Sequence, residues 1–163
     1  MKEINTDFYV PLVTLKLCKE KLVPYGLEGR FCLPECIAKI GRTIIGDADK
    51  ECMLVVSLDA KCHPLAVECI AVGRCNNARV EMRDVIKSTL LSNATAIVLL
   101  HNHPSSDITP SEEDLSFTKR VKEATDFVGM TLLDHVIIGS CNEEFYSMKE
   151  SEEWEMIQDE REH

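Results

Sequence analysis

The chain has 163 residues, 45% of them apolar, which is enough for one ordinary domain with a buried core. Its formal net charge is −10, whereas nucleic-acid binders normally present a basic face that neutralises phosphates, so we do not expect a nucleic-acid partner. The first residues lack the apolar core of a signal peptide and no run approaches the ~20 apolar residues of a membrane span, so we expect no leader and no membrane anchor.

The predicted elements alternate between strands and helices. In chain order they are an extended segment at 9–17, a helix near 34–44, strands at 52–58 and 65–72, a helix at 82–92, a strand at 96–103, a helix at 110–128 and a strand at 134–139. The two strands at 52–58 and 65–72 read as a hairpin. This alternation predicts an α/β (mixed α+β) fold, a mixed sheet with helices packed on its faces.

The last 15 residues differ in composition from the rest. Residues 149–163 hold seven acidic and two basic side chains, a net charge of −5. We therefore divide the chain into a domain at 1–148 and an acidic tail at 149–163. Trp154, Met156 and Ile157 could pack back on the domain as a final helix, and a solvated acidic end is the alternative; composition leaves both open.

Residues 101–114 carry the strongest signal for chemistry. His101 and His103 follow the apolar run 94–100 at spacing i, i+2, so on a strand both imidazoles leave the same face. Ser111 and Asp114 stand at i, i+3 near the start of the helix that follows, so they also share a face. Two imidazoles and one carboxylate on zinc leave a fourth position open, which is the stoichiometry of a catalytic site.

The helix start is predicted two residues before Ser111. Thr109 is a good N-cap, Pro110 suits the first helical position, and Glu112 completes a Thr-x-x-Glu capping box. The segment then reads as strand, tight loop and helix, with the candidate ligands at the junction. The alternative interpretation is a polar loop with surface histidines, and the full spacing favours a centre for metal-assisted hydrolysis.

The same string resembles a known family. His-x-His-x7-Ser-x2-Asp matches the JAMM motif of the JAB/MPN metalloproteases. His-Asn-His-Pro-Ser-Ser, Thr-Pro-Ser-x-x-Asp and Leu-Leu-Asp-His-Val-Ile-Ile-Gly resemble the bacterial RadC-type JAB domain. The resemblance covers about residues 8–148 and implies a JAB/MPN-like fold. Because it begins so early, we expect a standalone domain without the N-terminal helix-hairpin-helix part of full-length RadC proteins.

The family mechanism requires an upstream glutamate as general base. The candidates in the first half of the chain are Glu35, Glu51, Glu68 and Glu81, and the residues alone leave the choice open. In JAMM proteins this glutamate heads a strand, so the resemblance selects Glu51. It further implies that Zn²⁺ is bound by His101, His103 and Asp114 and activates a water, and that Ser111 donates to the oxyanion.

Three further residues near the motif receive structural interpretations. Asn102 points to the opposite face of the strand, and Asp107 is read as a turn residue. His135 is read as a buried, hydrogen-bonded strand histidine, with support of the metal ligands as the alternative.

Eight cysteines are present, but no two form a Cys-x-x-Cys pair. We interpret them as thiols in a reducing cytosol, which predicts a cytoplasmic protein. A second zinc site built from Cys62, His63, Cys69 or Cys75 is a weak alternative.

The predicted function is zinc-dependent hydrolysis of an amide or isopeptide bond in a peptide or protein substrate. A non-catalytic JAB module for protein interaction is the second possibility. The DNA-repair association of RadC proteins is a third, for which these residues supply no mechanism. A zinc deaminase is excluded because its His-x-Glu and Pro-Cys-x-x-Cys segments are absent.

Overall fold

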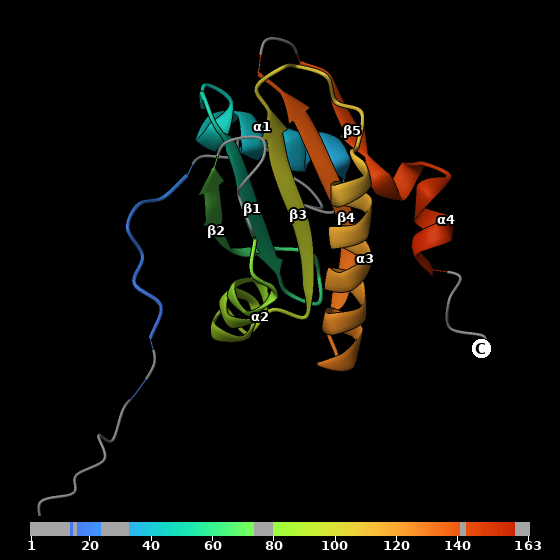
Figure 1. Ribbon diagram of the computed structural model, residues 1–163. Coiled ribbons are helices and arrows are strands. Elements are labelled where there is room, and N and C mark those ends of the chain that lie inside the picture. Colours follow the sequence, from blue (N-terminus) through green and yellow to red (C-terminus); the bar gives the residue numbers. More distant parts are fainter. Residues whose placement is uncertain (1–13, 15, 24–32, 74–79, 141–142, 159–163) are drawn as a thin grey trace, which may run out of the picture.

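The computed structural model describes residues 14, 16–23, 33–73, 80–140 and 143–158. Within them a five-stranded sheet has the order β2-β1-β3-β4-β5 (Figure 1). The strands are β1 (Glu51–Leu58), β2 (Pro64–Gly73), β3 (Ala96–His103), β4 (Thr131–Gly139) and β5 (Phe145–Ser147). Only β3 and β4 run parallel, and the other neighbours are antiparallel. The sheet is therefore mixed, as predicted, and β1 and β2 form the predicted hairpin.

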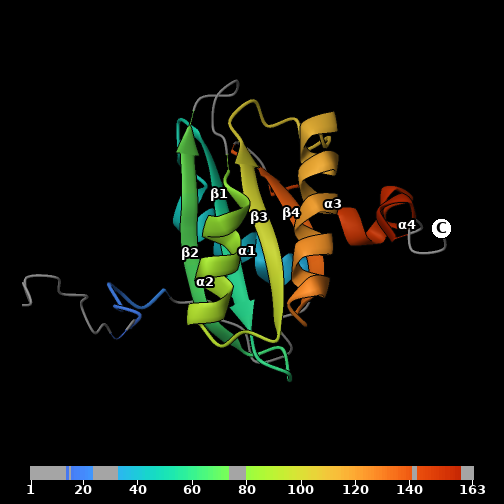
Figure 2. The ribbon, with the colours of Figure 1, turned by 60° about the horizontal axis from the view of Figure 1, so that its bottom comes forward.

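Helices cover both faces of this sheet. Helix α1 (Pro34–Ile45) lies behind it, and α2 (Met82–Leu91) and α3 (Glu112–Phe127) lie in front (Figures 1 and 2). A 3₁₀ turn, η1 (Met148–Glu150), and α4 (Glu153–Gln158) follow β5 and end beside α3. The predicted fold class, a mixed sheet with helices packed on its faces, is confirmed. No helix within the described ranges is long and apolar enough to cross a bilayer.

The two helix layers explain why β1 and β3 are apolar along almost their whole length. Alternate residues of these strands enter one core cluster against α1 and another against α2 and α3. Leu54 and Leu100 belong to the first cluster, and Val55 and Leu99 belong to the second. At the end of β3 the same alternation directs His101 and His103 toward the α3 side and Asn102 toward the α1 side.

The predicted start of α3 was wrong. The N-cap is Ser111, not Thr109, and the first helical residue is Glu112 rather than Pro110. The Ser111 Oγ accepts from the Asp114 backbone N–H at 3.2 Å, and the Asp114 carboxylate accepts from the Ser111 N–H at 2.8 Å. Both Thr-x-x-Glu and Ser-x-x-Asp fit a capping box, and the second prevails because Thr109 already donates its N–H to the Asp107 side chain at 3.0 Å.

Other boundaries differ less. β4 begins at Thr131, three residues before the predicted start, and α3 ends at Phe127 just before Gly129, whose φ of +77° suits a glycine after a helix. Of the expected extended segment at 9–17, residues 9–13 and 15 lie outside the described residues, and 14, 16 and 17 are exposed and in no helix or strand.

The end of the chain contributes to the core. Trp154 of α4 is 8% exposed and belongs, with Met148, to the core cluster on the α3 side, where Ile157 packs against it. Residues beyond 158 are outside the described ranges.

Candidate metal centre

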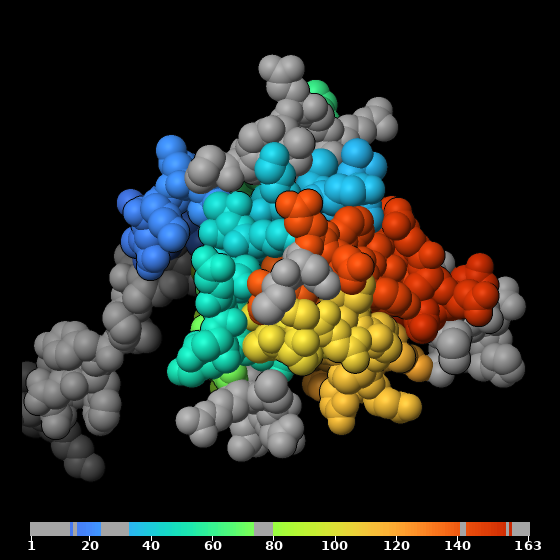
Figure 3. Space-filling view, turned by 90° about the horizontal axis from the view of Figure 1, so that it is seen from above, coloured from blue at the N-terminus to red at the C-terminus, as the bar shows by residue number. Residues whose placement is uncertain are grey.

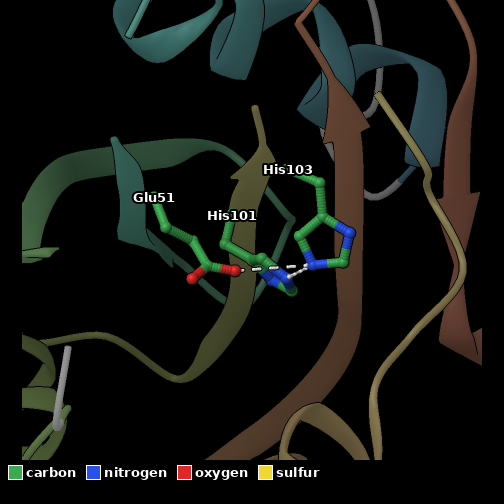
Figure 4. Close-up of side chains that lie close together, drawn as sticks. All are labelled: Glu51, His101 and His103. Atoms are coloured by element: carbon green, nitrogen blue, oxygen red, sulfur yellow. Dashed lines mark hydrogen bonds and ion pairs between the residues drawn. The ribbon is translucent and has the colours of Figure 1, made fainter. Parts of the chain in front are cut away.

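The candidate site lies where the start of β1 meets the end of β3. The last residue pair of these strands is Met53 with His101, so the register brings Glu51 opposite His103. Seen from above, the end of β3 and the loop after it (yellow) lie against the segment that leads into β1 (blue-green) (Figure 3). The side chains of Glu51, His101 and His103 point toward one another (Figure 4).

Four predicted side chains converge within hydrogen-bonding or ion-pair distance. The Nε2 atoms of His101 and His103 are 2.9 Å apart. The Asp114 carboxylate, on the first turn of α3, lies 3.3 Å from the His101 Nε2 and 3.6 Å from the His103 Nε2. The Glu51 Oε1 is 3.5 Å from the His103 Nε2. The ligand atoms of Glu51, His101 and His103 all lie within 4.8 Å of one another, so these three residues form a candidate metal-binding group.

The opposite ring nitrogen of each histidine already has a partner. The His103 Nδ1 lies 2.5 Å from the Asp107 carbonyl oxygen, which can only accept, so Nδ1 carries the proton. The His101 Nδ1 lies 2.8 Å from the His135 Nε2. When both rings are neutral and both Nδ1 atoms donate, both Nε2 atoms present lone pairs to the same point. This donor set fits a divalent metal such as zinc.

A short chain of hydrogen bonds supports His101 from behind. The His135 Nδ1 lies 2.5 Å from the Thr118 Oγ1, and the Thr118 hydroxyl donates to the Asp114 carbonyl oxygen at 2.6 Å. His135 is fully buried, so it is the predicted buried strand histidine, and it also contacts a candidate ligand. Sequence reasoning missed Thr118, although its spacing of four residues from Asp114 places it on the same side of α3.

Burial and the neighbouring charges shift the pKa values at the site. Burial lowers the pKa of His101 to about 4, and it also lowers the pKa of His135. The hydrogen bond with Asp114 raises the pKa of His103. Burial opposes ionisation of Asp114, but hydrogen bonds from His103 and Ser111 hold its pKa well below the ordinary range. Burial raises the pKa of Glu51 above its ordinary value.

An open cleft of about 1330 Å³ leads to this group. Glu51, His101 and His103 line its floor, and Phe117 and Arg120 of α3 line one side. A substrate can therefore reach the candidate ligands from solvent.

The other residues that the sequence singled out lie elsewhere or act differently. Glu35 is exposed on α1, behind the sheet, and Glu81 is exposed before α2. Glu68 lies on the edge strand β2 and is not part of the metal-binding group. The Ser111 hydroxyl lines the cleft and lies 2.6 Å from the Asp114 Oδ2, to which it donates.

The weak alternative of a second zinc site gains no support. Cys75 lies outside the described residues, and the His63 ring lies 3.0 Å from the Asp59 carboxylate. Within the described part of the chain, no group containing Cys62, His63 or Cys69 has metal-binding spacing.

Comparison with known proteins relates the chain to a family. The model of the RadC-like JAB domain matches residues 32–154. A UPF0758 protein of Desulfitobacterium hafniense is 41% identical over 117 residues, which cover 72% of this chain and 51% of the relative. A UPF0758 protein of Carboxydothermus hydrogenoformans is 37% identical over 129 residues, 77% of this chain and 56% of the relative. The chain thus spans about half the length of these curated relatives.

Proposed function

The chain belongs to the RadC-like JAB domain family, and we propose that it is a zinc-dependent hydrolase that cleaves an amide or isopeptide bond. The observation that carries this proposal is the convergence of the two imidazole Nε2 atoms and the Asp114 carboxylate beside Glu51, at the floor of an open cleft.

In this proposal His101, His103 and Asp114 hold the metal. Three protein ligands of this kind leave a position open, and a set of nitrogen and oxygen donors suits zinc. A bound zinc ion supplies a Lewis acid that lowers the pKa of water and polarises the scissile carbonyl. The hydrogen bonds of both Nδ1 atoms orient the two imidazoles before any ligand binds.

Glu51 is the general base. Its carboxylate lines the cleft 3.5 Å from the His103 Nε2, within reach of a water that attacks the substrate. Because burial raises its pKa, the carboxylate accepts a proton more readily than an exposed glutamate and then returns it to the leaving amine. The same side chain thus takes the proton from the water and gives it to the leaving amine.

Ser111 is the proposed oxyanion donor. Its hydroxyl lines the cleft but donates to Asp114 at 2.6 Å, so its O–H has to turn away from Asp114 to donate to a tetrahedral oxyanion. Loss of one such donor commonly lowers the rate by ~10²–10³-fold.

We propose a peptide or protein as the substrate, because the cleft of about 1330 Å³ is open and is lined by both polar and apolar side chains. A cytoplasmic location accords with the thiols of Cys18, Cys52 and Cys69, which form no disulfide. The name UPF0758, carried by the relatives, states no activity, so the reaction has to be tested directly.

The first test measures zinc. We expect about one zinc per purified chain and loss of that zinc in His103→Ala, with an unchanged far-UV circular dichroism spectrum. His63→Ala, an exposed histidine on the β1–β2 turn, is the matched control and should keep its zinc. Equal zinc content in His103→Ala and wild type would contradict the site.

The second test measures turnover. Zinc-loaded wild type and Glu51→Gln are compared on peptide and isopeptide libraries, with Glu68→Gln as the matched control. We expect turnover by wild type and by Glu68→Gln, and a loss of at least ~10²-fold in Glu51→Gln. Equal turnover by Glu51→Gln would remove it as the base, and no turnover by wild type would contradict the hydrolase.

A further inference from the structure

Asn102 stands between the two candidate metal-binding histidines but faces the other side of the sheet. It is fully buried. Its side-chain Oδ1 accepts from the Cys52 backbone N–H at 2.8 Å, and its Nδ2 donates to the Lys50 carbonyl oxygen at 3.0 Å. These two backbone groups flank Glu51, so one amide side chain holds the main chain on both sides of the proposed base.

These bonds begin where the pairing of β1 with β3 ends. The last residue pair is Met53 with His101, and one step further the register sets Asn102 opposite Cys52. At this position the side-chain amide of Asn102 bonds to β1 as a main-chain peptide group of a paired strand would. Its Oδ1 is the acceptor for the Cys52 N–H, and its Nδ2 is the donor to the Lys50 carbonyl oxygen. The two strands are thereby held together up to Glu51, which is the first residue of β1.

We propose that Asn102 is a positioning residue that fixes the backbone of Glu51 and so holds its carboxylate beside His103. The proposal rests on the proposed role of Glu51 as general base. Asn102 does not line the cleft and touches neither the substrate nor the metal ligands' Nε2 atoms. Its effect reaches the reaction only through the main chain of β1.

The position of Glu51 gives this support a role. Glu51 pairs with Gly73 of the edge strand β2, but it lies beyond the last β1–β3 residue pair, and residues 46–50 before it are in no helix or strand. The carboxylate is 3.5 Å from the His103 Nε2, and a displacement of about 1 Å in a reacting group can cost ~10²-fold in rate. Aspartate at position 102 keeps the acceptor but not the donor, and alanine lacks both.

The first experiment follows backbone hydrogen exchange by NMR and needs no substrate. In the wild type we expect the Cys52 amide to exchange slowly although it lies beyond the last β1–β3 residue pair. In Asn102→Ala that amide should exchange at least tenfold faster, while amides in the middle of β3 keep their wild-type rates. The matched control is Thr125→Ala, which removes another buried hydrogen bond at the far end of α3.

Either of two exchange results would overturn the proposal. One is a Cys52 amide that exchanges in the wild type as fast as an exposed loop amide, which requires no variant to fold. The other is an unchanged Cys52 rate in Asn102→Ala. Should the alanine variant fail to fold, Asn102→Asp keeps the acceptor for the Cys52 N–H and sets a second acceptor against the Lys50 carbonyl oxygen. Exchange rates at residues 50–52 equal to those of the wild type would then overturn the proposal.

The second experiment separates positioning of the base from a general loss of stability. With a substrate of the zinc-loaded protein, Asn102→Ala should lower kcat ~10–100-fold and leave KM and zinc content unchanged, whereas Thr125→Ala should leave all three unchanged. Adding Asn102→Ala to Glu51→Gln should cause no further loss of kcat. A full additional loss in the double variant, or wild-type kcat in Asn102→Ala, would overturn the positioning role. If the wild type hydrolyses nothing, the hydrolase proposal fails, and the exchange rates still decide whether Asn102 holds the β1 backbone.

Discussion

At the scale of single residues, the protonation of the two candidate ligands is set by the groups that face their Nδ1 atoms. The carbonyl oxygen of Asp107 fixes the proton of His103 on Nδ1. The position of the proton on His101 depends on a series of hydrogen bonds. The His101 Nδ1 donates to His135, His135 donates to the Thr118 hydroxyl, and that hydroxyl donates to the Asp114 carbonyl oxygen. The tautomer that exposes the His101 Nε2 therefore requires an acceptor at His135 and a further acceptor at Thr118.

This series of hydrogen bonds predicts that Thr118→Val weakens zinc binding, although no proposed zinc ligand is removed. Valine has nearly the shape of threonine but cannot accept from the His135 Nδ1, so His135 loses its preferred tautomer. We expect the zinc dissociation constant to rise ~10-fold, and His135→Ala to raise it by up to ~100-fold. Competition with a chromogenic chelator measures both constants. Thr125→Val, also on α3 and fully buried, is the control, and an unchanged affinity in Thr118→Val would contradict the chain of donors.

How much of the site could be predicted depends on how local its rules are. His101 and His103 share a face because strand side chains alternate, and Asp114 approaches them because the helix begins right after the loop; both rules act over a few residues. Glu51 is different, since its place beside His103 depends on the pairing of β1 with β3, two strands that are far apart in the sequence. For this reason the residues alone left four glutamates as candidates for the general base. The main-chain contacts of Asn102 depend on the same register.

At the scale of elements, the start of α3 shows two capping signals in competition. Thr109 and Ser111 each precede a suitable acid by three residues, and sequence rules alone do not rank them. The structure decides for Ser111, whose partner Asp114 also faces the histidines. The N3 partner in the capping box and the candidate metal ligand are thus the same side chain, Asp114.

The observed cap predicts unequal effects of two similar substitutions. Ser111→Ala removes the N-cap acceptor and should lower the free energy of unfolding of the metal-free protein by ~1 kcal/mol. Thr109→Ala removes an exposed hydroxyl outside the helix and should change it by less than ~0.5 kcal/mol. Urea denaturation followed by circular dichroism compares the two. The reverse order of effects would restore Thr109 as the cap.

Another prediction concerns the attachment of β5 and η1 to β4. The Asp134 carboxylate, 3% exposed, accepts from the Ser147 hydroxyl at 2.7 Å, the Lys149 N–H at 3.0 Å and the His135 N–H at 2.7 Å. Asp134→Ala leaves these donors without an acceptor and should lower the free energy of unfolding by ~1–3 kcal/mol. Asp134→Asn keeps an acceptor oxygen and should cost less. Equal urea midpoints for Asp134→Ala and wild type would show that the attachment does not depend on this carboxylate.

At the scale of the whole molecule, the sequence predicted the central sheet and the helices on its faces better than the short elements β5 and η1. The long strands and helices carry clear apolar periodicity, and their order determines a mixed sheet with two covered faces. β5 has three residues and η1 has three, too few for any period to show. The packing of Trp154 against the α3-side core followed from neither composition nor charge, because an acidic segment with one tryptophan fits a solvated end equally well.

Two buried histidines also make the stability of the metal-free protein depend on pH. Burial lowers the pKa of His101 to about 4 and that of His135 well below its ordinary value, so the folded state keeps both neutral where the unfolded chain takes up protons. Stability is therefore lost as the pH falls from about 6.5 toward 4, by up to ~1.4 kcal/mol per pH unit for each histidine. His103 has a raised pKa, and its contribution is fully present below about 6.5 and is lost above that pH.

We therefore expect the free energy of unfolding in EDTA, measured with urea, to fall between pH 6.5 and pH 5. Glu51 and Asp134, whose pKa values burial raises, oppose this fall at its acidic end. A variant comparison isolates the histidines, because His135→Gln removes one of the two groups that must stay neutral and should lessen the slope by up to ~1.4 kcal/mol per pH unit. His63→Gln, at an exposed position, should leave the slope unchanged. If His135→Gln does not change how the free energy of unfolding depends on pH, His135 does not stay neutral in the folded state. The order of donors from His101 through His135 to Thr118 would then be wrong.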